Sequence, residues 1–564
     1  MNATKRELSL VALFLSAMAV VYTWPLAAHL TSRIPGGPAT VDSLTGLYVL
    51  TWGIHALANH PMAFFHANVF YPHPEALAFG DHMFGMACMM APLQWTLANP
   101  VLTYNVGLLL TFVLGGLGMY LLARHITGSV PAGLLAALIY AFSGYRFHQI
   151  GQMNVLALHW LPWLFLIGHM YLEERHRRLI YVGAFFFFMQ AVSCTFSLYF
   201  LFVGLGLAIA GMLYRRRRRF AAFVRKHGYH FAIVGTLTLV AVYPFYHPYL
   251  SHDLEQKSFR RTASEVVTGS ADLVDLATVT PGSLLGPLLN PHGAARPPLF
   301  PGLAALILLV FLALQWRKRR ETDDHRLHYY ALLGLVACLF AFGPNLNVAG
   351  RNSGIPLPYM AAYQVVPGWW GMHIPLRFWI LASMAVAVLA AIAYRRLELW
   401  AATIPRGPSI VGALLVLAAV ELHPRPLELF EPTPPGGPPL VYRWLESTDP
   451  EAVVVEYPVA SPTGPATVRD AMHQYNSTYH WHAMVDGVAG WVPPLTQTFR
   501  ERMQAFPADH AMAQLRALHV DYVLVHYDEV PPAERGDLER RVQARRELAF
   551  EGRFGDITAY RFVD

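Results

Sequence analysis

The chain has 564 residues, of which 55% are hydrophobic and only 14% are charged, and its formal net charge at pH 7 is +6. Because soluble domains carry about 25% charged residues, this composition excludes an ordinary soluble protein and indicates one that crosses a membrane several times. The basic residues gather in short loops between apolar segments, a pattern that sets membrane orientation and does not indicate a nucleic-acid-binding surface.

Eleven segments are apolar enough to predict spanning helices, each of which needs roughly 20 residues. The first apolar segment is longer than that of a signal peptide and no clean cleavage site follows it, so we expect an uncleaved helix. Residues 179–214 are too long for one span and have basic flanks, so they are expected to cross twice with a turn near Cys194. The eleven segments are 9–29, 101–123, 130–146, 154–172, 179–194, 197–214, 230–249, 300–316, 328–345, 376–394 and 408–423.

The charges of the loops predict the orientation of the chain. If the N-terminus is cytoplasmic, Lys5, Arg6 and every later basic loop, including the run "RRRRR" at 215–219, lie on the cytoplasmic side of a bacterial inner membrane. An odd number of spans then puts the C-terminus outside. The segment 83–98 is interpreted as an interfacial, half-buried helix, because a further span there would reverse the side of every later basic loop.

The predicted spans leave four extracytoplasmic parts, of which the last reads as a separate domain. After the Pro/Gly linker "EPTPPGGPP", the stretches "EAVVVEYPV" and "VDYVLVHY" have the pattern of buried strands, and the stretch between 494 and 518 has that of helices. His480 and His482 alternate around Trp481 and are expected to share one strand face. We therefore expect a transmembrane domain at 1–423, with outer loops at 30–100, 250–299 and 346–375, and a soluble α/β domain at 424–564.

Ionisable residues at the outer rim of a membrane domain are functional candidates, because such positions are energetically costly. A carboxylate there suits a general base, and arginines suit a phosphate, which they bind in a bidentate manner. With an apolar bundle below them for a lipid tail, these residues predict transfer of a group from a lipid-linked phosphate to an acceptor outside the membrane. The candidates are Asp42, Asp81, His82, Arg146, His148, His159, Arg260, Arg261, Glu265, His373 and Arg377.

Four stretches carry a resemblance to a known family: "TVDSLTGLYVLTWGIHAL", "NVFYPHPEALAFGDH", "YRFHQIGQMNVLALHWLPW" and "STYHWHAMVDGVAGWVPP". The chain resembles bacterial members of the GT-C glycosyltransferases, integral membrane enzymes that use polyprenyl-phosphate sugars. The resemblance implies a polytopic α-helical fold with a soluble outer domain, and it implies that Asp42 is the catalytic base. Asp81 matches a second acidic position of some members, where it helps to position the acceptor or binds a metal.

The resemblance leaves several points open. Some family members need a divalent cation and others do not, and the pair formed by Asp81 and His82 differs from the paired carboxylates that would favour one. The resemblance implies transfer of a sugar from a polyprenyl-phosphate donor to an acceptor hydroxyl group, and it leaves open whether the acceptor is a polysaccharide, a lipid or a protein. The alternatives are that Asp42 serves only as a helix N-cap, and that the chain is a non-catalytic lipid or polysaccharide transporter or a scaffold with a partner-binding tail.

Overall fold

A computed structural model describes residues 4–256, 262–280, 283–289, 296–318, 325–366, 369–421 and 426–563. The chain divides into two compact units, and neither is a continuous stretch of sequence. Unit 1 comprises Met1–Ala28 and Val106–Leu427, and unit 2 comprises His29–Asn105 and Glu428–Asp564. The predicted boundary at residue 423 falls close to the start of the second segment of unit 2, but the predicted first loop belongs to the same unit as the C-terminal domain.

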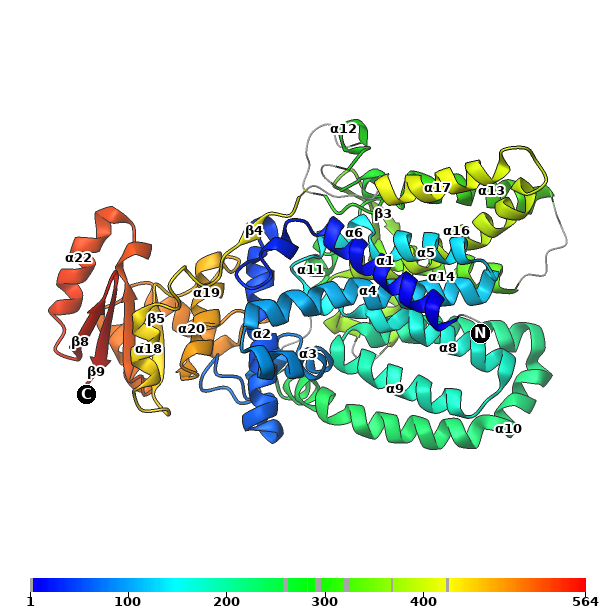
Figure 1. Ribbon diagram of the computed structural model, residues 1–564. Helices are drawn as coiled ribbons and strands as arrows, with labels where there is room; N and C mark the ends of the chain where they lie inside the picture. Colours follow the sequence, from blue (N-terminus) through cyan, green and yellow to red (C-terminus); the bar gives the residue numbers. More distant parts are fainter. Residues whose placement is uncertain are drawn as a thin grey trace. The chain divides into compact units, whose positions relative to one another are not determined.

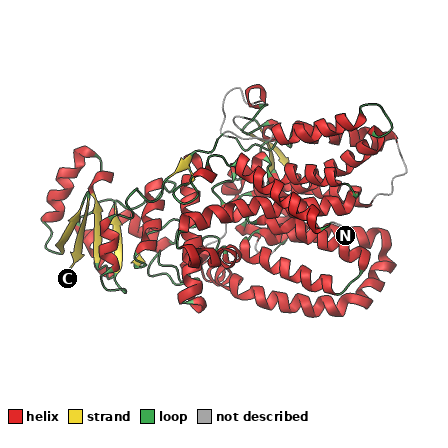
Figure 2. Cartoon of the chain, in the orientation of Figure 1, coloured by secondary structure: helices red, strands yellow, loops and turns green. Residues whose placement is uncertain are grey.

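Unit 1 is built almost entirely from helices (Figures 1 and 2), with one short antiparallel hairpin formed by β2 (Asn345–Val348) and β3 (Arg351–Pro356). The central helix is α16 (Trp379–Ala401), which packs against α5, α13, α14 and α17 and is buried along most of its length. The remaining helices of this unit are α1 (Lys5–Tyr22), α4 (Pro100–Thr127, which begins in unit 2), α5 (Val130–Ala141), α6 (Gly144–His148), α7 (Met153–Leu156), α8 (Leu161–Glu174), α9 (Arg178–Ser193), α10 (Ser197–Gln256), α11 (Ala263–Thr268), α12 (Gly286–Leu289), α13 (Leu303–Lys318), α14 (His325–Ala341), α15 (Tyr359–Val365) and α17 (Gly407–Glu421).

Many of these helices have the length and composition of membrane spans. All eleven predicted segments overlap helices, while the number that crosses a membrane stays a prediction. Within the described residues, six segments meet the criteria of length and hydropathy, and three apolar helices are shorter. The six are Pro100–Thr127, Val130–His148, Met153–Glu174, Ser197–Tyr214, Phe223–Ser251 and Pro375–Ala401, and the three are Arg178–Ser193, Leu303–Gln315 and Gly407–Glu421.

Residues 179–214 were expected to cross the membrane twice, and residues 230–249 once more. In the structure they form α9 and the 60-residue helix α10. The turn predicted near Cys194 is confirmed, because α9 ends at Ser193 and Cys194 is in an extended conformation. The hydroxyl group of Tyr246, late in α10, donates a hydrogen bond to the carbonyl of Thr195, which precedes that helix. A straight helix would separate these residues by about 75 Å, so α10 must double back between its two apolar segments.

Unit 2 contains a five-stranded mixed sheet with the strand order β6-β5-β7-β9-β8. The predicted strands are confirmed as β5 (Val453–Tyr457) and β7 (Tyr522–His526), which pair in parallel at the centre of the sheet. The predicted helical stretch forms α20 (Pro494–Met503) and α21 (Asp509–Ala517). The other elements of this domain are α18 (Leu440–Glu446), α19 (Val468–Asn476), α22 (Pro532–Gln543), β6 (Ala483–Met484), β8 (Leu548–Phe554) and β9 (Ile557–Phe562).

The expected strand around His480 and His482 is wrong. The strand β6 begins after them, and Trp481 has a φ angle of 61°, which extended strands do not allow. The turned backbone stacks the Trp481 ring on the ring of His55, with 3.9 Å between their centroids. Both histidines are buried, so the interpretation of these two side chains as packing residues is retained.

The first loop supplies two helices and an edge segment to unit 2. The helices are α2 (Thr40–Asn59) and α3 (Phe84–Leu97), and α3 has the position and the short length expected of the interfacial segment. Backbone hydrogen bonds join Met484 to the carbonyl of Asn68 at 2.7 Å and Tyr71 to the carbonyl of Met484 at 2.9 Å. The strand β1 (Ile34–Pro35) pairs with β4 (Leu429–Phe430). The loop is therefore an integral part of the same compact unit as the C-terminal domain.

Candidate active site

Asp42 lies in the first turn of α2, near the start of the segment that carries the family resemblance. The interpretation of this residue as an N-cap is wrong, because the helix begins at Thr40 and its N-cap residue is Ala39. The Asp42 side chain is exposed, and its carboxylate interacts electrostatically with Tyr104. An acid in the first turn also stabilises the helix through its dipole, so a modest structural contribution accompanies any chemical role.

Asp81 and His82 precede α3 and have different surroundings. Asp81 is half-buried, whereas His82 is fully buried. The Nδ1 atom of His82 accepts a hydrogen bond from the backbone N–H of Phe84 at 3.0 Å, and the rings of Phe64 and Phe65 contact the imidazole edge to face. Burial lowers the pKa of His82 to about 3, so this side chain is neutral at physiological pH. Its contacts are those of a packed core histidine.

Arg146, on α6, is a fully buried cation in unit 1. Its Nη2 atom donates to the carbonyls of Thr111 at 3.2 Å and Leu156 at 3.5 Å, and its guanidinium carbon lies 5.0 Å from the centre of the Phe112 ring. Its Nε and Nη1 atoms have no hydrogen-bond partner among the described residues, and no acid there pairs with it. An uncompensated buried cation is costly, so this arginine retains N–H groups that an anionic ligand can use.

His159, just before α8, is fully buried and interacts electrostatically with Arg146. Neither of its ring nitrogens has a hydrogen-bond partner in the part of the chain that the structure describes. The ring of Trp160 lies 4.6 Å from the histidine ring between centroids. Arg146 and His159 therefore place four nitrogen atoms that have no hydrogen-bond partner among the described residues inside unit 1.

Arg377, predicted from a distant part of the sequence, lies close to the same region of unit 1. Its Nη2 atom donates to the side-chain oxygen of Gln152 at 3.3 Å, and its guanidinium carbon lies 4.3 Å from the centre of the Phe196 ring. It also interacts electrostatically with Tyr145, the neighbour of Arg146 in the chain. The structure thus brings together the two sequence stretches that contain Arg146 and Arg377.

The other candidates have more local roles or lie outside the described residues. His148 is exposed at the end of α6, and His373 is half-buried. Glu265 forms a capping box with Thr262, whose backbone N–H donates to the Glu265 carboxylate at 2.7 Å, so it caps α11. Arg260 and Arg261 lie outside the described residues.

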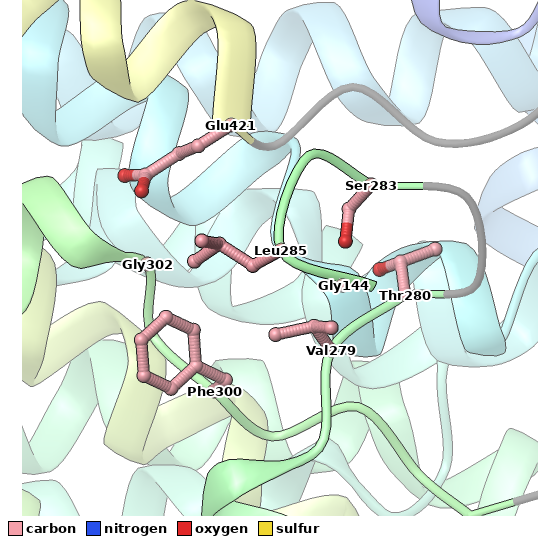
Figure 3. Close-up of a pocket in the computed structure, with 8 residues that line it drawn as sticks. All are labelled: Gly144, Val279, Thr280, Ser283, Leu285, Phe300, Gly302 and Glu421. Atoms are coloured by element: carbon pink, nitrogen blue, oxygen red, sulfur yellow. The ribbon is translucent and has the colours of Figure 1, made fainter. Parts of the chain in front are cut away.

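A small cavity in unit 1 contains one further buried acid (Figure 3). The carboxylate of Glu421, at the end of α17, accepts hydrogen bonds from the backbone N–H groups of Leu303 at 2.6 Å and Ala304 at 2.9 Å. These are the first residues of α13, so Glu421 caps the N-terminus of that helix. The rest of the lining is largely apolar or small: Gly144, Val279, Thr280, Ser283, Leu285, Phe300 and Gly302. The acid is fully explained by this structural contact.

Sequence reasoning missed one cluster in unit 2, formed by Glu456, His473 and His526. The potential ligand atoms of these three buried residues lie within 4.8 Å of one another, and they could hold a metal ion. Burial opposes a charge on His473, but the carboxylates of Glu456 and Glu529 outweigh it and raise the pKa of this histidine to about 9. Asp81 and His82 belong to no comparable group of three metal-ligating side chains among the described residues.

No protein-family model matches the chain, and no curated protein matches it in sequence. Solved structures do match. Over 99% of this chain, the arabinofuranosyltransferase AftD from Mycobacteria aligns with a TM-score of 0.60 and 16% sequence identity, and a second structural class of the same protein aligns over 100% of the chain with a TM-score of 0.53 and 15% identity. The chain spans only 41% and 42% of those two chains.

A third structure is the archaeal oligosaccharyltransferase AglB from Archaeoglobus fulgidus, in complex with an inhibitory peptide and a dolichol-phosphate. It aligns over 99% of this chain and 74% of its own length, with a TM-score of 0.46 and 12% identity. The apolar helices and the AftD alignment together establish a multi-pass membrane protein. At this level of identity, the alignments show that the chain shares the fold of AftD.

Proposed function

We propose that the protein is a membrane glycosyltransferase that moves a sugar from a polyprenyl-phosphate donor to a hydroxyl group of an extracytoplasmic acceptor. The observation that supports this most strongly is the alignment with AftD, a protein described as an arabinofuranosyltransferase, over 99% of the chain. The exposed carboxylate of Asp42 at the start of α2 adds a group with the chemistry of a general base. The acceptor is a polysaccharide, a lipid or a protein.

In the proposed reaction, Asp42 removes the proton from the acceptor hydroxyl as its oxygen attacks the anomeric carbon of the sugar. The new carbon–oxygen bond forms while the bond from the anomeric carbon to the phosphate oxygen breaks. The electron pair of that bond leaves with the polyprenyl phosphate, and the proton stays on the Asp42 carboxyl group until it is lost to solvent. A single displacement of this kind inverts the configuration of the sugar.

The arginines of unit 1 are assigned to the phosphate of the donor. Arg146 has two nitrogen atoms without partners in the described structure, and a guanidinium group can donate two parallel hydrogen bonds to phosphate oxygens. We assign His159 and Arg377 to the same donor, and Asp81, His148 and His373 to substrate positioning. The assignment of Arg260 and Arg261 rests on their sequence alone. His82 and Glu265 make local contacts, and their contact with substrate stays a prediction.

We derive no step through a metal ion. The residues around Asp81 do not offer a third ligand in the described structure, and Asp42 is not part of a group of metal-ligating side chains there. The proposed location is the inner membrane of a bacterium, with a cytoplasmic N-terminus and an extracytoplasmic C-terminal domain. This orientation rests on the basic loops of the sequence.

The test is transfer of radiolabelled sugar from polyprenyl-phosphate donors by the purified protein. Replacing Asp42 by Asn removes the base but preserves size, and we expect the rate to fall by about 10²–10⁴-fold. The matched control is Asp537→Asn on α22, an exposed acid of the same unit, which should retain the activity of the unchanged protein. Equal rates for Asp42→Asn and the control would refute the role of Asp42, and absence of transfer from every donor would favour a transporter or a scaffold.

A further inference from the structure

The cluster missed by sequence reasoning lies where the two central strands of the outer domain end. Glu456 is the penultimate residue of β5, and His526 is the last residue of β7, which runs parallel to it. His473 reaches the same place from α19. Parallel α/β sheets bind their ligands beside the carboxyl ends of the strands, because side chains from neighbouring strands converge there.

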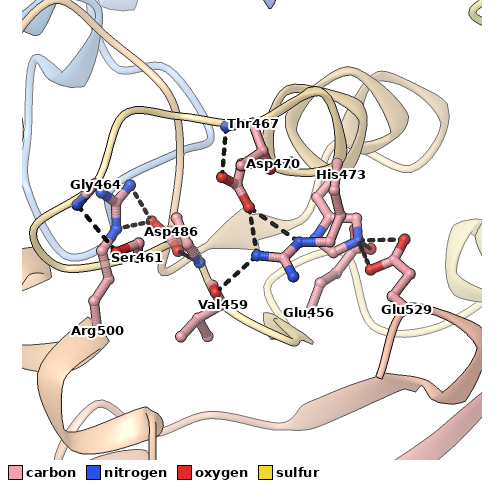
Figure 4. A network of polar contacts seen from close by, with 12 residues as sticks. Glu456, Val459, Ser461, Gly464, Thr467, Asp470, His473, Asp486, Arg500 and Glu529 are labelled. Atoms are coloured by element: carbon pink, nitrogen blue, oxygen red, sulfur yellow. Dashed lines mark hydrogen bonds and ion pairs between the residues drawn. The ribbon is translucent and has the colours of Figure 1, made fainter. Parts of the chain in front are cut away.

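The distances within the cluster match those between the ligands of a small metal ion. The Nε2 atoms of His526 and His473 lie 2.7 Å and 3.7 Å from the same Oε2 atom of Glu456. Glu529 extends the set, with its Oε2 atom 3.0 Å from Nε2 of His473 (Figure 4). Ligands of a tetrahedral Zn²⁺ ion are separated by about 3.3 Å, so the observed spacings bracket the edge of such a tetrahedron.

The contacts made by the protein leave part of this cluster unsatisfied. Glu456 is only 4% exposed, and its Oε1 atom has no hydrogen-bond partner among the described residues. The basic side chains nearest to it are the two histidines, since the neighbouring Arg469 pairs instead with Asp470 and with the carbonyl of Val459. A buried carboxylate oxygen without a partner is costly, and a bound cation would remove that cost.

An outer layer of hydrogen bonds fixes the orientation of the carboxylate. The hydroxyl group of Tyr442 donates to Oε2 of Glu456 at 2.9 Å, and the side-chain nitrogen of Asn476 donates to the Tyr442 oxygen at 3.1 Å. All three residues are buried. Metal ligands in proteins are typically held by outer-layer contacts of this type.

We propose that Glu456, His473 and His526 bind a single Zn²⁺ ion, with Glu529 as the fourth ligand. Two imidazoles and two carboxylates are a donor set that suits Zn²⁺ and disfavours Mg²⁺ or Ca²⁺, which prefer oxygen ligands. The ion joins β5, β7 and α19 and thereby stabilises the outer domain. This proposal does not depend on the glycosyltransferase reaction, because the ligands include none of the residues assigned to it.

The experiment uses full-length protein in detergent, stripped with a chelator and titrated with Co²⁺, a spectroscopic substitute for Zn²⁺. We expect saturation at one Co²⁺ per chain with the visible absorption of a tetrahedral site, its loss when Zn²⁺ is added, and a higher midpoint of thermal unfolding with metal. His473→Gln and Glu456→Gln should each weaken Co²⁺ binding by at least about tenfold. The matched control is His510→Gln on α21, an exposed histidine of the same unit.

A further variant separates lost binding from lost folding. Glu529 is partly exposed, so Glu529→Gln should lower the thermal midpoint of the metal-free protein only slightly, through the loss of its ion pair with His473, while it weakens Co²⁺ binding and alters the absorption bands. Absence of tetrahedral absorption in the unchanged protein would overturn the proposal. It would also be overturned if His473→Gln and His510→Gln lowered binding equally, or if Glu529→Gln and Glu456→Gln both retained full affinity.

Discussion

Two fully buried basic side chains, His82 and Arg146, are accommodated in opposite ways. His82 is neutral, because it is buried against two aromatic rings and a backbone N–H donates a hydrogen bond to its Nδ1 atom. Arg146 keeps its charge, because a guanidinium group stays protonated in proteins. Its Nε and Nη1 atoms have no hydrogen-bond partner among the described residues. The contacts described for the histidine are therefore those of a packing residue, whereas the arginine is the better candidate for a ligand contact.

The neutral state of His82 predicts a dependence of stability on pH. The pKa is 6.5 for an ordinary histidine and about 3 for His82 in the folded protein, so the unfolded chain binds the extra proton first as the pH falls. The contribution to stability is thus complete above pH 6.5 and is lost progressively as the pH falls toward 3. At pH 5.5 the loss is about 1.4 kcal/mol.

The measurement is the midpoint of thermal unfolding at pH 7.5 and pH 5.5. His82→Asn keeps an acceptor near the position of Nδ1 but cannot titrate, so its midpoint should fall less between these two pH values than that of the unchanged protein. His510→Gln, at an exposed position on α21, should show the full decrease. Identical decreases for His82→Asn and the unchanged protein would contradict the prediction.

The residues of the candidate sites were predictable only where they lie near each other in the sequence or carry a family pattern. Asp42 was proposed because an acid follows the first apolar helix, and its catalytic role stays a prediction. The cluster of Glu456, His473 and His526 was not found, because its members come from two strands and a helix and have no metal-binding spacing. Only the parallel pairing of β5 with β7 reveals that the first and last of these residues are neighbours.

At the level of elements, the apolar segments and the strands of the C-terminal domain were predicted well, since both follow from hydrophobic patterning. The predictions failed where an interaction with a distant segment decides the local conformation. The stretch around His480 alternates like a strand, but the stacking of Trp481 on His55 favours a turned backbone. The basic run at 215–219 was expected to be a loop between two spans, and α10 does double back between its two apolar segments, although its backbone is helical through the run.

The capping box of α19 yields a prediction at this scale. The side chain of Thr467 accepts a hydrogen bond from the backbone N–H of Asp470 at 3.4 Å, and the Asp470 carboxylate accepts one from the N–H of Thr467 at 2.8 Å (Figure 4). Thr467→Ala removes the first of these contacts and should destabilise unit 2 by about 1 kcal/mol. Thermal unfolding of the purified protein measures the effect.

A threonine outside a cap provides the control. Thr498 lies in the middle of α20, where its hydroxyl group donates to the carbonyl of Pro494, and Thr498→Ala should change stability by less than about 0.5 kcal/mol. Because α19 carries His473, Thr467→Ala should also weaken the proposed metal site. A thermal midpoint unchanged by Thr467→Ala would show that the capping box contributes nothing measurable.

At the scale of the molecule, the notable feature of unit 2 is that it unites two segments separated by more than 300 residues of sequence. The first loop contributes α2, α3 and the segment Asn68–Tyr71, which is hydrogen-bonded to Met484, and Tyr71 packs against the hydrophobic core of the C-terminal domain. The ring of Phe79 lies 5.1 Å from that of Trp491 between centroids. We therefore expect the loop and the C-terminal domain to unfold as one cooperative body.

Gly487 offers a direct test of this cooperativity. A Cβ atom there would lie 3.0 Å from Cβ of Val69 and 3.2 Å from the Phe70 ring, so Gly487→Ala should overpack the contact and cost about 1–3 kcal/mol. Gly536→Ala is the matched control, because open space surrounds this position in α22 and alanine favours helix by roughly 0.5–1 kcal/mol. If the two segments unfold together, the first loop and the C-terminal domain of Gly487→Ala should become sensitive to protease at one shared temperature, which is lower than in the unchanged protein. Gly536→Ala should raise that shared temperature. Cleavage of the first loop at an unaltered temperature would show instead that the loop holds its structure independently of the tail.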